Sequence, residues 1–140
     1  MPSATTESRK LKVIMDTNAF FVPLQFRIGL PSELDRLLRR SFEMVLLSPV
    51  KRELITLANR RSPSTKKKAE YALKIAEKCT YIDMKSSHSM PTDDAIVSAA
   101  KDWKAAVFTN DRQLRKRLRD ISVPVIYVRQ KSRLEIDGMI

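Results

Sequence analysis

Short apolar runs alternate with longer stretches of helical periodicity along the chain. The apolar runs are 11–15, 43–47, 80–84, 105–109 and 123–128. Continuous apolar runs of this length are typical of strands that are buried on both faces of a sheet. Five buried strands are therefore predicted.

Helical spacing of apolar residues fills the segments between these runs. The faces consist of Leu34, Leu37 and Leu38; of Val50, Leu54, Leu57 and Ala58; of Ile96, Ala99, Ala100 and Trp103; and of Leu114, Leu118 and Ile121. Apolar residues three and four positions apart lie on one side of a helix. A further helix is predicted over 65–78, and Ser48-Pro49 predicts a serine N-cap followed by proline in the first turn.

Strands that alternate with helices predict an α/β fold. The expected architecture is a three-layer α/β/α sandwich with a mostly parallel central sheet. We expect a single domain over residues 11–130, a disordered N-terminal tail over 1–10 and a C-terminal tail over 131–140. In such sheets binding sites form beyond the carboxyl ends of the strands.

Composition narrows the possible chemistry. The 140 residues are 43% apolar and 31% charged, without an apolar run long enough to span a membrane or a signal peptide, so a cytoplasmic protein is expected. One cysteine, Cys79, excludes an internal disulfide, and two glycines exclude a glycine-rich phosphate loop. A catalytic triad would need His88, which has no nucleophile elbow near it. Chemistry is therefore expected to depend on carboxylates.

The positive charge of the chain indicates a polyanionic partner. Lys and Arg number 27 against 16 Asp and Glu, giving a net charge of +11. The charge is clustered in 112–119 and 129–133. Binding to a nucleic acid releases its condensed counterions, so a nucleic acid is the expected class of partner. The residues predicted to contact its backbone are Arg112, Arg115, Lys116 and Arg119; the alternative is a solvated helix face.

Acidic residues occur where predicted strands give way to predicted helices. Asp16 follows the first strand, Glu53 lies near the start of the helix after the second strand, Asp93 and Asp94 open a helix, and Asp111 follows the strand 105–109. The parallel fold can bring these places to one edge of the sheet. Capping and the helix dipole are the alternative reason for acids at helix starts.

A cluster of carboxylates predicts a cation. Converging carboxylates raise each other's pKa unless a positive charge neutralises them. Sites with only oxygen ligands usually bind Mg²⁺ or Mn²⁺. Asn18, Thr109 and Asn110 stand beside these acids and are expected to orient a carboxylate or a bound water. Their alternative role is turn formation.

At these residues the sequence resembles the PIN-domain family of metal-dependent ribonucleases. The resemblance is carried, in order, by "MDTNAF", "VKREL", "TDDAIVSAA" and "FTND". It implies a divalent-metal-dependent endoribonuclease whose catalytic and metal-binding residues are Asp16, Glu53, Asp94 and Asp111. It also implies that Asp93 is an auxiliary acid, because the acid of the family directly precedes a stretch such as "AIVSAA".

Two further stretches resemble the ribosomal-RNA-processing branch of the family more than its toxins. They are "DTNAFFVPLQFRIGLPSEL" and "VPVIYVRQKSRLEI", and the chain looks like an archaeal stand-alone form of that branch. The alternatives are the ribonuclease toxin of a toxin–antitoxin pair and a catalytically silent RNA-binding assembly factor. A homodimer is also considered, with Phe20, Phe21 and Phe26 either in its interface or, as is more usual, in the core.

Overall fold

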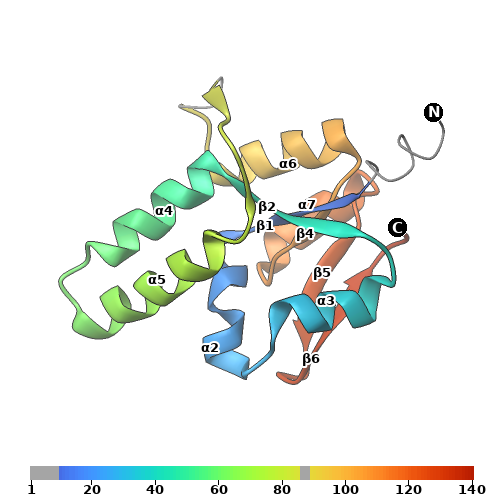
Figure 1. Ribbon diagram of the computed structural model, residues 1–140. Helices are drawn as coiled ribbons and strands as arrows, with labels where there is room; N and C mark the ends of the chain where they lie inside the picture. The colour runs from blue at the N-terminus through green and yellow to red at the C-terminus, as the bar shows by residue number, and fades with distance from the viewer. Residues whose placement is uncertain (1–9, 86–88) are drawn as a thin grey trace, which may run out of the picture.

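The computed structural model describes residues 10–85 and 89–140, so His88 and positions 1–9 of the expected N-terminal tail lie outside the described residues. Figure 1 shows the arrangement of the elements along the chain. In chain order they are β1 (Leu11–Met15), η1 (Thr17–Phe21), α2 (Val22–Phe26), α3 (Leu30–Leu38), β2 (Phe42–Leu47), α4 (Ser48–Ala58), α5 (Pro63–Ala76), β3 (Thr80–Ile82), α6 (Thr92–Trp103), β4 (Ala106–Phe108), α7 (Arg112–Asp120), β5 (Val125–Arg129) and β6 (Arg133–Asp137).

The strands form one sheet in the order β3-β2-β1-β4-β5-β6. Every neighbouring pair is parallel except β5 and β6, which run antiparallel. Central strand β1 is almost wholly apolar, and Val13, Ile14 and Met15 are fully buried. This burial on both faces is why these strands lack an alternating pattern. The predicted α/β fold with a mostly parallel sheet is confirmed.

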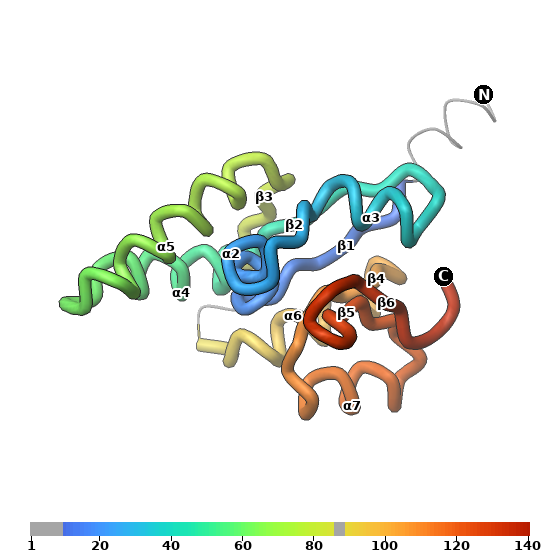
Figure 2. Tube along the Cα trace, turned by 90° about the horizontal axis from the view of Figure 1, so that it is seen from below, coloured from blue at the N-terminus to red at the C-terminus, as the bar shows by residue number. Residues whose placement is uncertain are grey.

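Helices cover both faces of the sheet. Figure 2 shows α2, α3 and α5 on one side of it and α6 and α7 on the other. The buried core includes Phe20, Leu34, Ile96 and Phe108, and Phe21 and Phe26 pack against it while partly exposed. These phenylalanines therefore serve core packing rather than a free dimer surface. Among the described residues, none of the helices has the length and apolarity that a membrane crossing requires.

The segment 131–140, expected to be a tail, contains β6. Gln130 and Lys131 both adopt left-handed backbone angles, with φ of 53° and 58°, and so form the tight turn that joins β5 to β6. Turns with two positive φ angles suit the twist of a β-hairpin but usually carry Asn or Gly. Because neither turn position is Asn or Gly, the sequence did not indicate a hairpin here.

The predicted serine N-cap of α4 is wrong. Ser48 lies inside the helix, and the capping position belongs to Leu47, whose side chain makes no capping bond. The Ser48 hydroxyl instead accepts a hydrogen bond from the backbone N–H of Met84 at 2.8 Å. Ser48 therefore fastens the segment after β3 to the start of α4, close to the carboxyl edge of the sheet.

Candidate active site

The register of the two central strands determines where Asp16 lies. Met15 of β1 pairs with Phe108 of β4, so the residues that follow them, Asp16 and Thr109, leave the sheet side by side. The backbone N–H of Asp16 still bonds the carbonyl of Phe108 at 3.0 Å. Both side chains are buried, with 6% of Asp16 and none of Thr109 exposed. A carboxylate is thus fixed at the carboxyl end of the central strands.

Three donors hold the Asp16 carboxylate. The Thr17 N–H donates to Oδ1 at 2.8 Å, while Thr109 Oγ1 and Asn18 Nδ2 donate to Oδ2 at 2.7 and 3.1 Å. Burial raises the pKa of Asp16, the bonds from Thr109 and Thr17 oppose that rise, and the nearby charges of Asp93 and Glu53 add to it. Asp16 therefore sits in a negative environment that a cation would relieve.

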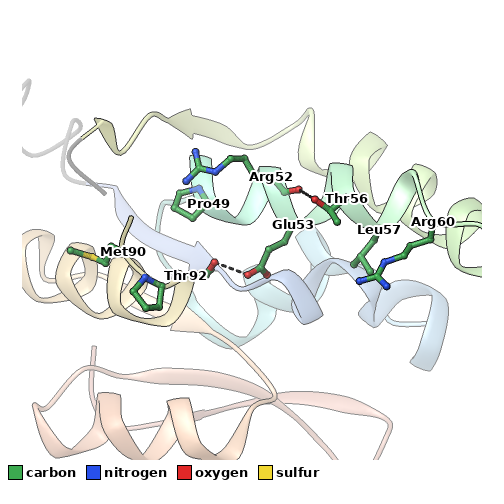
Figure 3. Close-up of a pocket in the computed structure, with 9 residues that line it drawn as sticks. Pro49, Arg52, Glu53, Thr56, Leu57, Arg60, Met90 and Thr92 are labelled. Atoms are coloured by element: carbon green, nitrogen blue, oxygen red, sulfur yellow. Dashed lines mark hydrogen bonds between the residues drawn. The ribbon is translucent and has the colours of Figure 1, made fainter. Parts of the chain in front are cut away.

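Glu53 is drawn toward the same place by two hydroxyls. Thr17 Oγ1 donates to one carboxylate oxygen and Thr92 Oγ1 donates to the other at 2.6 Å. The bond between Thr92 and Glu53 is drawn in Figure 3. These bonds connect α4 with η1 and with the start of α6. The two threonines are functional neighbours that the sequence analysis missed, and the "MDTN" and "PTDD" threonines beside the acids were the available signal.

The two acids that open α6 have different surroundings. Burial, followed by the charges of Asp111 and Glu53, raises the pKa of Asp93. Asp94 forms an ion pair of 2.6 Å with Arg117 of α7 and is 41% exposed. Asp93 is therefore influenced by the charges of the acidic cluster and Asp94 carries an ion pair beside it, while the role of each acid at the site stays a prediction. Adjacent helical residues point about 100° apart, so only one of them can face a given neighbour.

Asp111 both caps α7 and belongs to the cluster. Its Oδ1 accepts hydrogen bonds from the backbone N–H groups of Gln113 and Leu114 at 2.9 and 3.0 Å. Its charge is among those that raise the pKa of Asp93. Asp111 is therefore a helix cap whose charge also acts on the acidic cluster.

Amide side chains connect the ends of three strands at this edge. Asn18 Oδ1 accepts from the backbone N–H of Asn110 at 3.0 Å, and Asn110 Oδ1 accepts from the N–H of Val128 in β5 at 2.8 Å. Thr109 Oγ1 accepts from the Asp111 N–H at 3.1 Å. Thr109 and Asn18 thus contact Asp16 directly, whereas Asn110 positions backbone and touches no carboxylate through these bonds.

The donor chemistry of the cluster fits a hard divalent cation. Asp16, Glu53, Asp93 and Asp111 offer only oxygen atoms, and their mutual repulsion favours a bound positive charge. Across residues 10–85 and 89–140, no three acidic, His or Cys side chains already surround a common point closely enough to hold a metal. Glu53 and Asp111 are engaged by the hydrogen bonds above, so ion binding requires these side chains to adjust.

The basic helix α7 is less available than its sequence suggested. Arg112 and Lys116 are exposed. Arg115 and Arg119, in contrast, both pair with Asp137 of β6, at 3.1 and 3.2 Å. Arg115 also lies over the ring of Tyr127, 3.7 Å from its centre. Of the four residues predicted to contact RNA, Arg115 and Arg119 therefore share one carboxylate within the fold, and the RNA contact of all four stays a prediction.

A basic groove runs past the acidic cluster. It has a volume of about 650 Å³ and is lined by Asn18, Gln25, Phe26, Thr109, Asn110, Arg112, Arg115, Tyr127, Val128, Arg129, Gln130 and Lys131. Arg129 and Lys131 come from the β5–β6 hairpin, which the sequence analysis did not anticipate. The α7 groove, as we name this cleft, begins at Asn18 and Thr109, the two partners of Asp16.

An acidic cluster at the carboxyl edge of a parallel sheet, with a basic groove beside it, defines an α/β domain of the nuclease type. The family described as PIN like domain matches residues 13–131. The chain belongs to this PIN-domain family, which confirms the resemblance seen in the sequence.

Relatives and a solved structure agree with that assignment. The chain is 35% identical to Ribonuclease VapC4 of Methanocaldococcus jannaschii over 92% of this chain and 98% of that protein. It is 26% identical to Ribonuclease VapC9 of Archaeoglobus fulgidus over 66% of each. The solved structure of the PIN domain endonuclease Utp24 superposes with a TM-score of 0.77 at 26% identity, covering 92% of both chains.

Proposed function

We propose that the protein is a divalent-metal-dependent endoribonuclease that cleaves at the acidic cluster. The observation that carries this proposal is the meeting of Asp16, Glu53, Asp93 and Asp111 at one edge of the sheet, next to a basic groove. Membership of the PIN-domain family and the names of its ribonuclease relatives support it.

We infer that Asp16, Glu53, Asp93 and Asp111 hold Mg²⁺ or Mn²⁺. A bound divalent ion lowers the pKa of water and stabilises the charge that develops during attack on a phosphodiester. Thr109 and Asn18 keep the Asp16 carboxylate at the end of β1, and Thr17 and Thr92 keep Glu53 within reach of it. Such hydrolysis requires no histidine and leaves a 5′-phosphate and a 3′-hydroxyl.

The α7 groove is proposed to position the RNA strand. Arg112 and Lys131 line it and would neutralise phosphates without reading the base sequence, while Arg129 in the same lining is paired with Glu135.

We propose that the protein processes ribosomal RNA. We expect its substrate to be a ribosomal RNA precursor in the cytoplasm. The stretches that resemble the processing branch and the structural likeness to the endonuclease Utp24 support it. The second candidate is a ribonuclease toxin with an antitoxin partner, favoured by the identity to Ribonuclease VapC4 over almost its whole length. Crosslinking to RNA in the source cells distinguishes them: enrichment at one ribosomal precursor junction supports processing, and enrichment at other RNAs contradicts it.

Cleavage of unstructured RNA by the purified protein tests the enzymatic proposal. We expect cleavage with Mn²⁺ or Mg²⁺, none with a chelator, and loss of activity in Asp16→Asn, which removes one charge from the cluster but keeps the side chain's size. RNA binding without cleavage in any of these ions would contradict the proposal and identify the protein as an RNA-binding factor.

A further inference from the structure

A second cleft leaves the acidic cluster along α4. Two neighbouring cavities of about 600 and 650 Å³ share Leu57 and Arg60 in their walls, and they are treated together as one cleft. It is lined by Pro49, Arg52, Glu53, Thr56, Leu57, Arg60, Arg61, Ser62, Thr65, Met90, Pro91 and Thr92. Figure 3 shows the part near Glu53. This cleft, named here the α4 groove, was not anticipated from the sequence.

The α4 groove starts at the candidate active site. Glu53 and Thr92 line it and are bonded to each other at 2.6 Å. Glu53 also accepts a hydrogen bond from Thr17, the residue that follows Asp16. Any extended molecule lying in this groove therefore passes directly beside the acidic cluster.

The lining of the α4 groove suits a polyanion. Arg52, Arg60 and Arg61 are exposed, and the hydroxyls of Ser62 and Thr65 lie in the same walls. Glu53, at the end that meets the cluster, is the acid of this lining. Arg52 lies on α4 and Arg60 lies just beyond the end of that helix at Ala58, so they present charges at separate places along the groove.

The two grooves diverge from the cluster. In strand order α4 follows β2 and α7 follows β4, on opposite flanks of β1, which carries Asp16 at its end. The α4 groove includes Glu53, the α7 groove includes the Asp16 partners Asn18 and Thr109, and the two have no lining residue in common. A strand that occupied both would lie across the acidic cluster with bound phosphates on each side.

We propose that the α4 groove is a second RNA-backbone subsite, in which Arg52 and Arg60 position phosphates on the side of the scissile bond away from the α7 groove. This inference rests on the proposed function for the location of the scissile bond. Arg52 and Arg60 are positioning residues that act on binding of the strand and not on the reacting atoms.

The test is the double variant Arg52→Gln/Arg60→Gln, with an unstructured RNA of about 20 nucleotides as the probe. Binding is measured in chelator over a series of salt concentrations, and cleavage is measured with Mn²⁺. We expect affinity to fall about tenfold and the slope of log affinity against log salt to decrease by about 1.4, the value for two phosphate contacts on a single strand. KM should rise with kcat nearly unchanged, and Arg52→Lys/Arg60→Lys should restore most of the affinity.

Lys101→Gln/Lys104→Gln is the matched control. It removes the same charge from α6 and its C-cap, where both lysines line a cavity with Lys10 and Lys12 of the opposite edge of the sheet. The control should bind and cleave like the wild-type protein. Unchanged affinity and salt slope in Arg52→Gln/Arg60→Gln, or an equal loss in the control, would overturn the inference and leave the groove to a protein partner.

The inference and the proposed function fail in different measurements. Absence of cleavage by the wild-type protein contradicts the function, whereas the binding series in chelator tests the groove without any cleavage. Circular dichroism and thermal unfolding check that the exposed substitutions leave the fold intact. An equal thermal shift with Mn²⁺ in wild-type and variant proteins shows that Glu53, next to Arg52, keeps its place in the cluster.

Discussion

The acidic cluster and the basic helix α7 are both concentrations of like charge, but the fold treats them in opposite ways. Asp16 is buried and Asp93 is exposed, and neighbouring carboxylates contribute to raising the pKa of both. On α7, Arg115 and Arg119 are paired with Asp137, and Arg117 is paired with Asp94. Part of the positive charge on the helix is therefore paired with acids of the fold. The negative charge of the cluster lies mainly beside other negative charges.

Charge that the fold leaves unpaired is the charge available to a ligand. Neighbouring Asp93 and Asp94 make this point within one turn of helix: one remains in the cluster and the other is satisfied by Arg117. Arg112 and Lys116 are the exposed counterparts on α7. Pairing, rather than residue type, separates candidate functional charges from structural ones.

The largest expected effect contrasts Asp93→Asn with Asp94→Asn. We expect Asp93→Asn to lower kcat/KM for RNA cleavage by about a thousandfold, equivalent to several kcal/mol of lost electrostatic stabilisation. Asp94→Asn should change it only a few-fold, since exposed ion pairs contribute at most about 1 kcal/mol. Equal losses in both variants would contradict the assignment of Asp93 to the cluster, and full activity in Asp93→Asn would exclude it from catalysis.

Metal binding should stabilise the cluster by an amount set by mass action. At a Mn²⁺ concentration about 100 times Kd, the free energy of unfolding should rise by roughly 2.7 kcal/mol. Differential scanning calorimetry should show this shift in the wild-type protein and in Asp94→Asn, and little of it in Asp16→Asn. A similar shift in all three proteins would mean that the ion binds elsewhere.

The two kinds of arginine on α7 should respond differently to substitution. Arg112→Gln/Lys116→Gln should reduce RNA affinity about tenfold and leave stability unchanged, because these groups are exposed. Arg119→Gln should lower the free energy of unfolding by about 1 kcal/mol, because it removes an ion pair with Asp137 and a bond to the Val123 carbonyl. Affinity titrations and urea unfolding measure the two effects, and an exchange of phenotypes would invalidate the distinction.

The smallest effect concerns pH. The folded state raises the pKa of Asp16 above its ordinary 3.8, so it binds the proton more tightly than the unfolded chain does. The resulting stabilisation is complete below pH 3.8 and is lost as pH rises through the raised pKa. In chelator, Asp16→Asn should therefore gain in Tm relative to the wild-type protein as pH increases above about 4. A constant or shrinking difference would show that burial does not disfavour the charged form.

The mostly parallel sheet and the edge that carries the acids could be predicted because they depend on local patterns. Each of the five predicted strands is present, because a strand such as 11–15 is recognisable from its uninterrupted apolar run, but β3 is largely exposed rather than buried. Strand β6 was missed because its turn uses Gln130 and Lys131 in backbone conformations usual for Asn or Gly. Because the hairpin was not predicted, the position of Asp137, which pairs with both Arg115 and Arg119, was not predicted either.

Finer features of the site depend on contacts between distant residues. Asp94 is paired with Arg117 of α7, and Glu53 is held by hydroxyls 36 and 39 positions away, on Thr17 and Thr92. No periodicity or spacing encodes such pairs. The family resemblance selects this dipeptide, and which of its two acids serves the site stays a prediction.

The chain of amides through Asn18 and Asn110 has a consequence for redesign. It braces the mouth of the cleft, from β1 across to Val128, with groups that carry dipoles but no formal charge. Rigidity and net charge are thereby governed by separate sets of side chains. An engineer could alter the ion preference by exchanging one carboxylate at a time while the frame around it remains in place.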